Sequence, residues 1–203
     1  MTKLFLAIRQ DQRIRFLTNF TLPDKMMVNY IKNKPKISHN MDNKSYTTEF
    51  SVSQTPGECF NAIKNFRGWW SEEIEGATDK LDETFLYHYK DVHLSKLRLS
   101  EEIPDRKLVY DVLDNQFSFT ENKNEWRGTK LVFEISGDND KTTVKFTHDG
   151  LVPEEECYDV CTDAWGNYIN NSLHHLISTG KGEPNPKEAD GFNAEIVKKW
   201  KLK

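Results

Sequence analysis

The amino-acid sequence predicts a single α+β domain in which an antiparallel β-sheet packs against one long C-terminal helix. Two patterns predict this class. From residue 84 to residue 148, short segments of alternating apolar and polar residues follow one another with short turns between them, which is typical of an antiparallel sheet. From residue 154 to residue 179, the apolar residues recur at helical spacing instead. A chain of 203 residues, 36% of them hydrophobic, is long enough to bury the core of one such domain.

The first expected elements are a strand and a short helix. Residues 45–53 (SYTTEFSVS) alternate with the period of a half-buried strand. Thr55 then precedes Pro56, and Glu58 lies three residues after Thr55, which is the arrangement of a helix capping box with proline at the first helical position. A short helix is therefore expected over residues 56–66.

The segment that follows, residues 67–83, breaks the regular pattern with two glycines, two tryptophans and several acidic residues. It predicts a second short helical turn and then a loop. Trp69 and Trp70 cannot both face the same way in regular structure. We therefore expect one of them in the core and the other at an opening, with two core tryptophans as the alternative.

Six strand-like segments follow, and their connections are nearly all short, which favours an antiparallel meander. In the last segment Val144, Phe146 and His148 share one parity, so they are expected to point inward. Asp149 points to the opposite face, because neighbours on a strand alternate. The expected segments are residues 84–90, 92–103, 107–113, 117–121, 128–136 and 141–148.

The long helix is expected over residues 154–179. Pro153 and three glutamates mark its start, and Gly180 lies just past its end. At 100° per residue, one stripe of this helix is expected to face the sheet. The members of that stripe are Cys157, Cys161, Ala164, Trp165, Tyr168, Ser172 and Leu176.

Both ends of the chain are expected to lie outside the domain, which spans residues 45–182. Residues 1–40 hold eight Lys and Arg against Asp11 and Asp24, so residues 1–44 are interpreted as a basic, disordered extension. Residues 183–203 are expected to form a mostly flexible tail. Because Met41 lies just before the first strand, translation from Met1 and translation from Met41 both remain open.

Charge and cysteine content limit the function. The net charge is −4, and residues 41–203 alone carry −10, which disfavours binding to nucleic acid or to an anionic membrane. The apolar run over residues 4–8 is too short for a signal peptide or a membrane span. Three cysteines without an export signal indicate a cytoplasmic protein with free thiols.

The sequence also resembles a known family, in the segments TPGECFNAI, GWWS, EWRGTKLVFEIS and FTHDGLVPEEECYDVCTDAWGNYINNSLHHLISTGKGEPNP. These segments are similar to bacterial homologues of the activator of the heat shock protein 90 ATPase, within the SRPBCC superfamily, which includes START and pollen-allergen-like domains. The resemblance covers residues 45–186 and is most specific in the C-terminal segment.

The resemblance implies a helix-grip fold, in which a curved antiparallel sheet wraps around the C-terminal helix, with two short helices after the first strand. It also implies a cavity between sheet and helix that holds a lipid-like or other apolar molecule. Two alternatives stay open. One is a cyclase or aromatase that uses His148 as acid or base, and the other is a co-chaperone that stimulates a chaperone ATPase. Whether the protein is an enzyme is not decided, and no catalytic residue is assigned.

Cys157 and Cys161 raise the question of metal or thiol chemistry, because they are four residues apart on a helix. Zinc requires four ligands, and only His148 is expected nearby, so the set is one ligand short. A cysteine nucleophile requires a base at hydrogen-bond distance and a third group that orients the base. We therefore interpret both cysteines as core residues and expect no metal and no cofactor.

The candidate binding residues follow from strand parity and helical phase. They are aromatic side chains and one inward histidine, a combination that suits an apolar ligand oriented by a few polar groups. The expected partner is a small apolar molecule, and both a monomer and a homodimer remain open. The candidates are Trp69, Tyr87, Tyr110, Phe133, His148, Trp165 and Tyr168.

Overall fold

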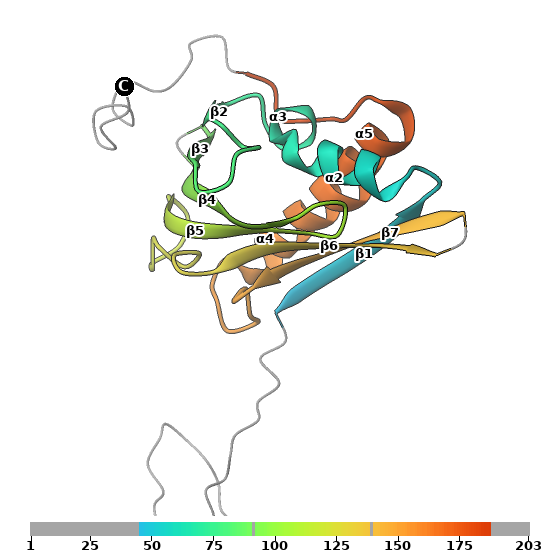
Figure 1. Cartoon of the computed structure of the whole chain (residues 1–203). Helices are drawn as coiled ribbons and strands as arrows, with labels where there is room; N and C mark the ends of the chain where they lie inside the picture. The colour runs from blue at the N-terminus through green and yellow to red at the C-terminus, as the bar shows by residue number, and fades with distance from the viewer. Residues whose placement is uncertain (1–44, 91, 139, 188–203) are drawn as a thin grey trace, which may run out of the picture. The chain divides into compact units, whose positions relative to one another are not determined.

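A computed structural model describes residues 45–90, 92–138 and 140–187. The predicted extension over residues 1–44 and most of the predicted tail lie outside the described residues. The α+β class and the helix-grip architecture are confirmed (Figure 1). Seven antiparallel strands form one sheet in the order β1-β7-β6-β5-β4-β3-β2, and the C-terminal helix runs across one face of it.

The strands match the predicted segments with two differences. The segment 117–121 is not a separate strand, because β5 runs on to Phe117 and the chain then turns. A short strand, β2, lies within the segment expected to be a loop. The bounds are β1 Tyr46–Val52, β2 Ile74–Gly76, β3 Thr84–Tyr89, β4 His93–Ile103, β5 Lys107–Phe117, β6 Lys130–Asp138 and β7 Lys141–Asp149.

Two short helices follow β1, as predicted: α2 spans Pro56–Lys64 and α3 spans Phe66–Trp69. The capping box is present. The Thr55 hydroxyl accepts from the Glu58 backbone N–H at 3.3 Å, and the Glu58 carboxylate accepts from the Thr55 backbone N–H at 2.8 Å. Trp69 and Trp70 are both buried, so the expectation that one of them stands at an opening is wrong. The chain leaves the helix at Trp70, which lets the two rings turn into the core together.

The C-terminal helix differs from the prediction in its start and in its winding. It begins at Tyr158 rather than at Glu154 and comprises α4 (Tyr158–Asn167), a π-helical segment η1 (Tyr168–Leu173) and α5 (His174–Thr179). The wider turns of η1 bring Ile169 and Ile177 to the buried face in place of Tyr168 and Leu176. Tyr168 and Leu176, expected on the inner stripe, are therefore only half-buried. The buried apolar positions are Cys161, Trp165, Ile169, Leu173 and Ile177, and Ser172 is buried as expected.

Glu125 explains where the helix begins. Its carboxylate is buried, and its two oxygens accept from the backbone N–H groups of Glu156 and Cys157 at 2.8 and 2.9 Å. A carboxylate from the loop between β5 and β6 thus satisfies two N–H groups of the turn that leads into the helix, including that of the N-cap residue Cys157. Residues 153–157 can stay in turns before α4 because these donors are bonded to Glu125.

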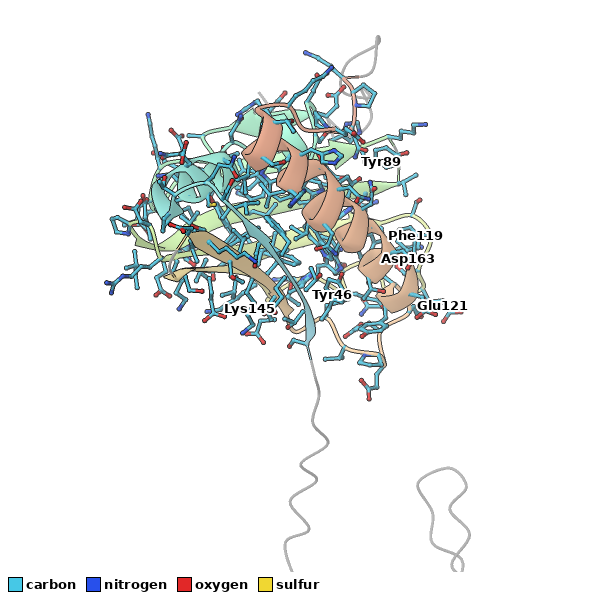
Figure 2. The ribbon with its side chains drawn as sticks, turned by 90° about the vertical axis from the view of Figure 1, so that its right-hand side faces the viewer. Tyr46, Tyr89, Phe119, Glu121, Lys145 and Asp163 are labelled. Atoms are coloured by element: carbon cyan, nitrogen blue, oxygen red, sulfur yellow. The ribbon has the colours of Figure 1, made fainter. Side chains whose placement is uncertain are left out.

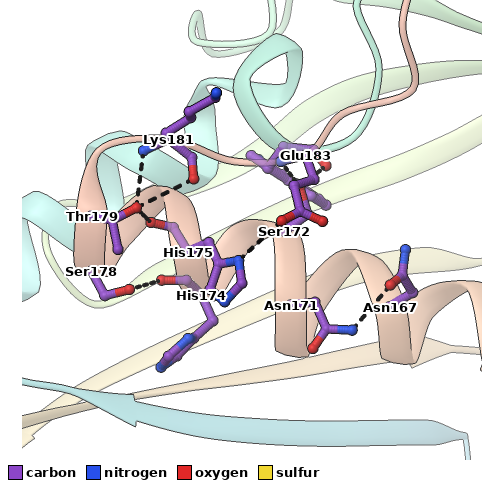
Figure 3. A network of polar contacts seen from close by, with 10 residues as sticks. Asn167, Asn171, Ser172, His174, His175, Ser178, Thr179, Lys181 and Glu183 are labelled. Carbon is purple, nitrogen blue, oxygen red and sulfur yellow. Dashed lines mark hydrogen bonds and ion pairs between the residues drawn. The ribbon is translucent and has the colours of Figure 1, made fainter.

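The segment after α5 is held against the domain beyond the expected boundary at residue 182. The Glu183 backbone N–H donates to the Ser172 hydroxyl at 2.7 Å (Figure 3). Asn185 forms a parallel bridge with Ser71, in which the Asn185 N–H donates to the Trp70 carbonyl at 3.0 Å. We call residues 181–187 the C-terminal strap. In the parts of the chain that the structure describes, no helix has the length and apolarity needed to span a membrane.

Candidate functional site

The predicted binding residues converge between the sheet and the C-terminal helix. Six of the seven are buried, and Tyr168 is half-buried. Strand register brings the sheet residues together, since Tyr110 of β5 pairs with Leu131 of β6, which in turn pairs with His148 of β7. The helix contributes Trp165 and Tyr168 from the opposite side. The seven residues therefore lie in one interior between sheet and helix, where they form two groups.

The first group lies beneath the short helices and consists of Trp69, Tyr110 and Phe133. The Phe133 ring is 6.0 Å from Trp69 and 6.3 Å from Tyr110, measured between ring centroids. Both polar groups bond to the backbone: Trp69 Nε1–H donates to the Ile63 carbonyl at 3.0 Å, and the Tyr110 hydroxyl donates to the Thr78 carbonyl at 3.1 Å. Burial raises the pKa of Tyr110 well above its usual range. This group is a core in which every polar atom already has a partner.

The second group lies under the helix and includes Tyr87, Trp165 and Tyr168. Tyr87 stacks on Trp70 at 3.9 Å with an angle of 13° between the rings, and Trp70 is 5.2 Å from Trp165. Asn185 of the C-terminal strap donates to the Tyr168 hydroxyl at 2.7 Å. Burial raises the pKa of both Tyr87 and Tyr168. The hydroxyls of Tyr87 and Tyr168 therefore lie at the edge of the interior that the C-terminal strap covers.

His148 has a hydrogen-bond partner at each ring nitrogen. Trp165 Nε1–H donates to Nδ1 at 3.0 Å, so Nδ1 is the unprotonated nitrogen. Nε2 therefore carries the proton and donates to the Thr129 hydroxyl at 2.8 Å, and that hydroxyl donates in turn to the Trp126 carbonyl at 2.6 Å. Burial lowers the pKa of His148 to about 3. The ring is neutral and fixed in one tautomer.

This arrangement limits what His148 can do chemically. A general acid or base needs a ring nitrogen within reach of the reacting proton, and both nitrogens of His148 are bonded to the protein. Asp149, its neighbour in sequence, points to the other face as predicted and accepts from the Ser45 hydroxyl at 3.1 Å. His148 therefore joins strand, loop and helix rather than belonging to a His-Asp dyad.

Two aromatic residues missing from the prediction, His93 and Trp126, extend the second group. Trp126 stacks on Trp165 at 5.5 Å and 15°, and its ring centroid is 4.6 Å from both His93 and His148. His93 Nε2 shares a hydrogen bond with the Ser95 hydroxyl at 2.7 Å. Burial, together with the neighbouring His148, lowers the pKa of His93 to about 3.

The Trp126 indole nitrogen is the unusual atom of the site. Trp126 is 4% exposed, and within the described residues its N–H has no hydrogen-bond acceptor. An indole nitrogen can only donate, and a buried donor without an acceptor costs about 1–3 kcal/mol. The neighbouring tryptophans differ, since Trp69 and Trp165 both donate to protein acceptors.

Sequence reasoning missed Trp126 because it lies in residues 118–129, between β5 and β6, where no periodicity indicates the direction of a side chain. His93, in contrast, lies in the predicted segment 92–103 and shares the parity of the buried Leu97 and Leu99, so strand alternation could have found it. A usable signal was the concentration of aromatic residues at both ends of this loop, namely Phe117, Phe119 and Trp126.

The cysteines lie in the core. Cys157 and Cys161 are buried and reduced, and the proximity of Cys161, burial and Glu125 raise the pKa of the Cys157 thiol far above its usual range. A thiol in that state is a poor nucleophile. Within residues 45–90, 92–138 and 140–187, no three His, Cys, Asp or Glu side chains are grouped so that they could hold a metal ion.

A shallow depression of about 350 Å³ lies on the surface between the middle of β5 and the start of β6. Residues 111–113 and 127–130 line it, and none of the seven predicted binding residues does. Its charged groups already interact with one another, since Asp111 pairs with Arg98 at 2.8 Å and with Lys130 at 3.7 Å. The depression is therefore separate from the aromatic interior.

The fold and the site together define a helix-grip domain with an aromatic interior. Neither the comparison with family models nor the comparison with curated proteins finds a match to the sequence. Solved structures do share the fold. The Aha1 dimer from Colwellia psychrerythraea is 18% identical, with a TM-score of 0.56, over 68% of this chain and 98% of that protein.

Two further structures agree with this result. MLL2253 from Mesorhizobium loti is 11% identical over 63% of this chain and 92% of that one, with a TM-score of 0.51. DynU16, from the dynemicin biosynthetic locus, is 13% identical over 67% of this chain and 48% of that one, with a TM-score of 0.50. The helix-grip fold that the sequence resemblance implies is therefore shared with the Aha1 dimer and with these two structures.

Proposed function

We propose that the protein binds a small hydrophobic or aromatic molecule in the interior between the sheet and the C-terminal helix. One observation carries the proposal: an aromatic cluster extends from the sheet to the helix and contains a buried donor, the Trp126 N–H, for which the described part of the chain offers no acceptor. Burying apolar ligand surface against these rings stabilises a complex by about 25 cal/mol per Å². An acceptor atom on the ligand would supply the hydrogen bond that the Trp126 N–H lacks among the described residues.

Binding requires the cluster to open, because its rings are in contact with one another. The segment best suited to move is the loop over residues 118–129, which contains no helix or strand. Phe119 in this loop is 47% exposed, although it is a large apolar side chain. Movement of the loop would separate the Trp126 ring from the rings on β4 and the helix. It would break the loop's hydrogen bonds to Val112 of β5 and the bonds formed by Thr129 and Glu125, and would leave the pairing of β5 with β6 in place.

The two alternative functions receive less support from the described residues. A cyclase or aromatase would need His148 to exchange protons with a substrate, and both of its ring nitrogens are bonded to the protein. Stimulation of a chaperone ATPase rests on similarity to Aha1 at 18% identity, which extends to the fold alone. Binding without catalysis therefore fits the geometry best.

We further propose that the protein acts in the cytoplasm. The support is chemical, because all three cysteines, Cys59, Cys157 and Cys161, are buried free thiols. Such thiols persist in a reducing compartment. A homodimer remains a second proposal, and it draws on the dimer of the Colwellia psychrerythraea protein.

The proposal is tested with protein purified from its own host. Native mass spectrometry is expected to detect a co-purifying small molecule that is lost on denaturation. The fluorescence of the neutral dye N-phenylnaphthylamine is expected to rise on addition of ligand-free protein and to fall when the extracted molecule is added back. Absence of both a bound molecule and a dye response overturns the proposal.

A further inference from the structure

A continuous series of aromatic contacts leads from the surface to the Trp126 indole. Phe119 is 47% exposed and packs on Phe117 at a centroid distance of 4.8 Å. Phe117 packs on His93 at 4.5 Å, and His93 meets Trp126 edge to face at 4.6 Å. Figure 2 looks onto the C-terminal helix and shows Phe119 and Tyr89 along the same margin of the domain. We call Phe119, Phe117, His93 and Trp126 the ring ladder.

The inner end of the ring ladder differs from Tyr110 and Trp165 in its hydrogen bonding. Tyr110 and Trp165 have acceptors for their polar hydrogens, whereas the Trp126 N–H has none among the described residues. Trp126 is also 96% buried, given its 4% exposure, so bulk water does not satisfy the donor. A ligand that places an oxygen or nitrogen lone pair at this point would gain a hydrogen bond without breaking one in the protein.

The electrostatics of this end determine what kind of acceptor it suits. The two imidazoles that touch Trp126 are uncharged, because burial lowers the pKa of His93 and of His148 to about 3. The carboxylate next along the chain, Glu125, is engaged with the helix start and would repel an anion. A ligand carboxylate would therefore lose its hydration without gaining a cationic partner. A neutral acceptor such as a carbonyl oxygen carries no such cost.

The surrounding side chains determine the shape of the ligand. Rings of Phe117, His93, His148 and Trp165 all contact the Trp126 ring. A molecule that inserts between these rings breaks their aromatic contacts with Trp126. It can replace those contacts only if it is itself aromatic. The second requirement is therefore an aromatic body, in addition to the neutral acceptor.

We propose that the ring ladder is the access route of the interior, and that Trp126 recognises a neutral aromatic ligand through a hydrogen bond from its indole N–H to a carbonyl-type acceptor. The inference rests on the proposed function, because it names the ligand class and the recognition group of that same interior. Phe119 opens the route, and Trp126 selects the ligand at its inner end.

Fluorenone and fluorene are a suitable pair of probes, because they share one planar aromatic frame and differ in a carbonyl against a methylene group. Calorimetric titration of the wild-type protein is expected to give about tenfold tighter binding of fluorenone, the gain of one satisfied hydrogen bond. Equal affinities overturn the inference and leave the proposed function standing. Failure of both fluorenes and of N-phenylnaphthylamine to bind overturns the proposed function as well, and failure of the fluorenes alone overturns the inference.

The variant Trp126→Phe assigns the preference to the indole N–H. It keeps an aromatic ring and removes the donor, so the affinity for fluorenone is expected to fall to that for fluorene, while the affinity for fluorene changes little. A preference for fluorenone that survives in Trp126→Phe overturns the assignment. The wild-type comparison decides the question of ligand class even if this variant does not fold.

Phe119 tests the route separately from recognition. Phe119→Ser is expected to change the association and dissociation rates of fluorenone by severalfold in stopped-flow measurements. Leu81→Ser is the matched control, because Leu81 is 50% exposed and lies outside the ring ladder. Rates unchanged in both variants, or changed equally in both, remove Phe119 from the route.

Discussion

Trp165 of the C-terminal helix donates its indole N–H to Nδ1 of His148 on β7 at 3.0 Å. Two further hydrogen bonds follow: His148 Nε2–H donates to the Thr129 hydroxyl, and that hydroxyl donates to the Trp126 carbonyl. One chain of hydrogen bonds thus joins the helix, the sheet and the loop that carries Trp126. It holds the floor of the proposed site in place while leaving the Trp126 N–H available.

The lowered pKa values of His148 and His93 predict an acid-sensitive fold. The folded protein protonates His148 and His93 only near pH 3, whereas the unfolded chain protonates them near 6.5. Because the unfolded chain binds more protons between these values, the free energy of unfolding should fall as the pH drops from 6.5 towards 3. Each histidine contributes up to about 1.4 kcal/mol per pH unit.

Urea unfolding at several pH values below 6.5 measures this slope. The variant His148→Gln lacks one titrating group, so its free energy of unfolding should fall less steeply with decreasing pH than that of the wild type. Parallel slopes for the two proteins would show that His148 is not buried in its neutral form.

Removing the hydroxyl of Thr129 should destabilise the fold. Thr129→Val keeps the shape of the side chain and deprives His148 Nε2–H of its acceptor. The expected loss is about 1–3 kcal/mol, as for a buried donor left without a partner. Thr147→Val is the control, because its hydroxyl pairs with Thr47 on the outer face of the sheet. Equal losses in urea unfolding would contradict the role assigned to Thr129.

Glu125 should be required for the start of the C-terminal helix. Glu125→Ala leaves the N–H groups of Glu156 and Cys157 without an acceptor and should cost about 1.5–3 kcal/mol. Glu121→Ala removes an exposed carboxylate of the same loop and should stay within about 0.5 kcal/mol of the wild type. Hydrogen exchange at Cys157 should accelerate in the first variant only, and unchanged exchange there would count against this capping role.

The C-terminal strap should depend on glycine at position 182. A Cβ atom built there would overlap the Gly68 carbonyl oxygen, so Gly182→Ala must push the strap outward. The bond from Asn185 to Tyr168 is expected to break with it. Limited proteolysis should then cut the strap faster than in Lys181→Ala, which alters an exposed neighbour. Equal cleavage rates would mean that the strap is not held at Gly182.

The fold was predictable where the chain follows a single period. Strand alternation placed His148 inward and Asp149 outward, and the Thr55–Glu58 capping box located the first helix. The prediction went wrong where regular spacing changes. The π-helical segment from Tyr168 shifts the buried face of the helix, and no sequence rule at 100° per residue anticipates an extra residue in a turn.

The candidate site was predictable only in part for a similar reason. Residues on strands and helices, such as Tyr87 and Trp165, have a face that periodicity assigns. Trp126 lies in an irregular loop, and long-range packing against Trp165 sets its orientation. Whether its N–H has an acceptor depends on residues that are distant in sequence, so the local sequence does not indicate that the described residues provide none.

The central claim is that a small aromatic molecule enters the interior between sheet and helix. The most direct test is nuclear magnetic resonance of the full chain with fluorenone, recording nuclear Overhauser effects between the probe and the indole rings. The account predicts contacts from fluorenone to Trp126 and Trp165, together with a downfield shift of the Trp126 N–H proton. Contacts confined to exposed side chains such as Ile103 and Val160, with the Trp126 resonance unmoved, would contradict it.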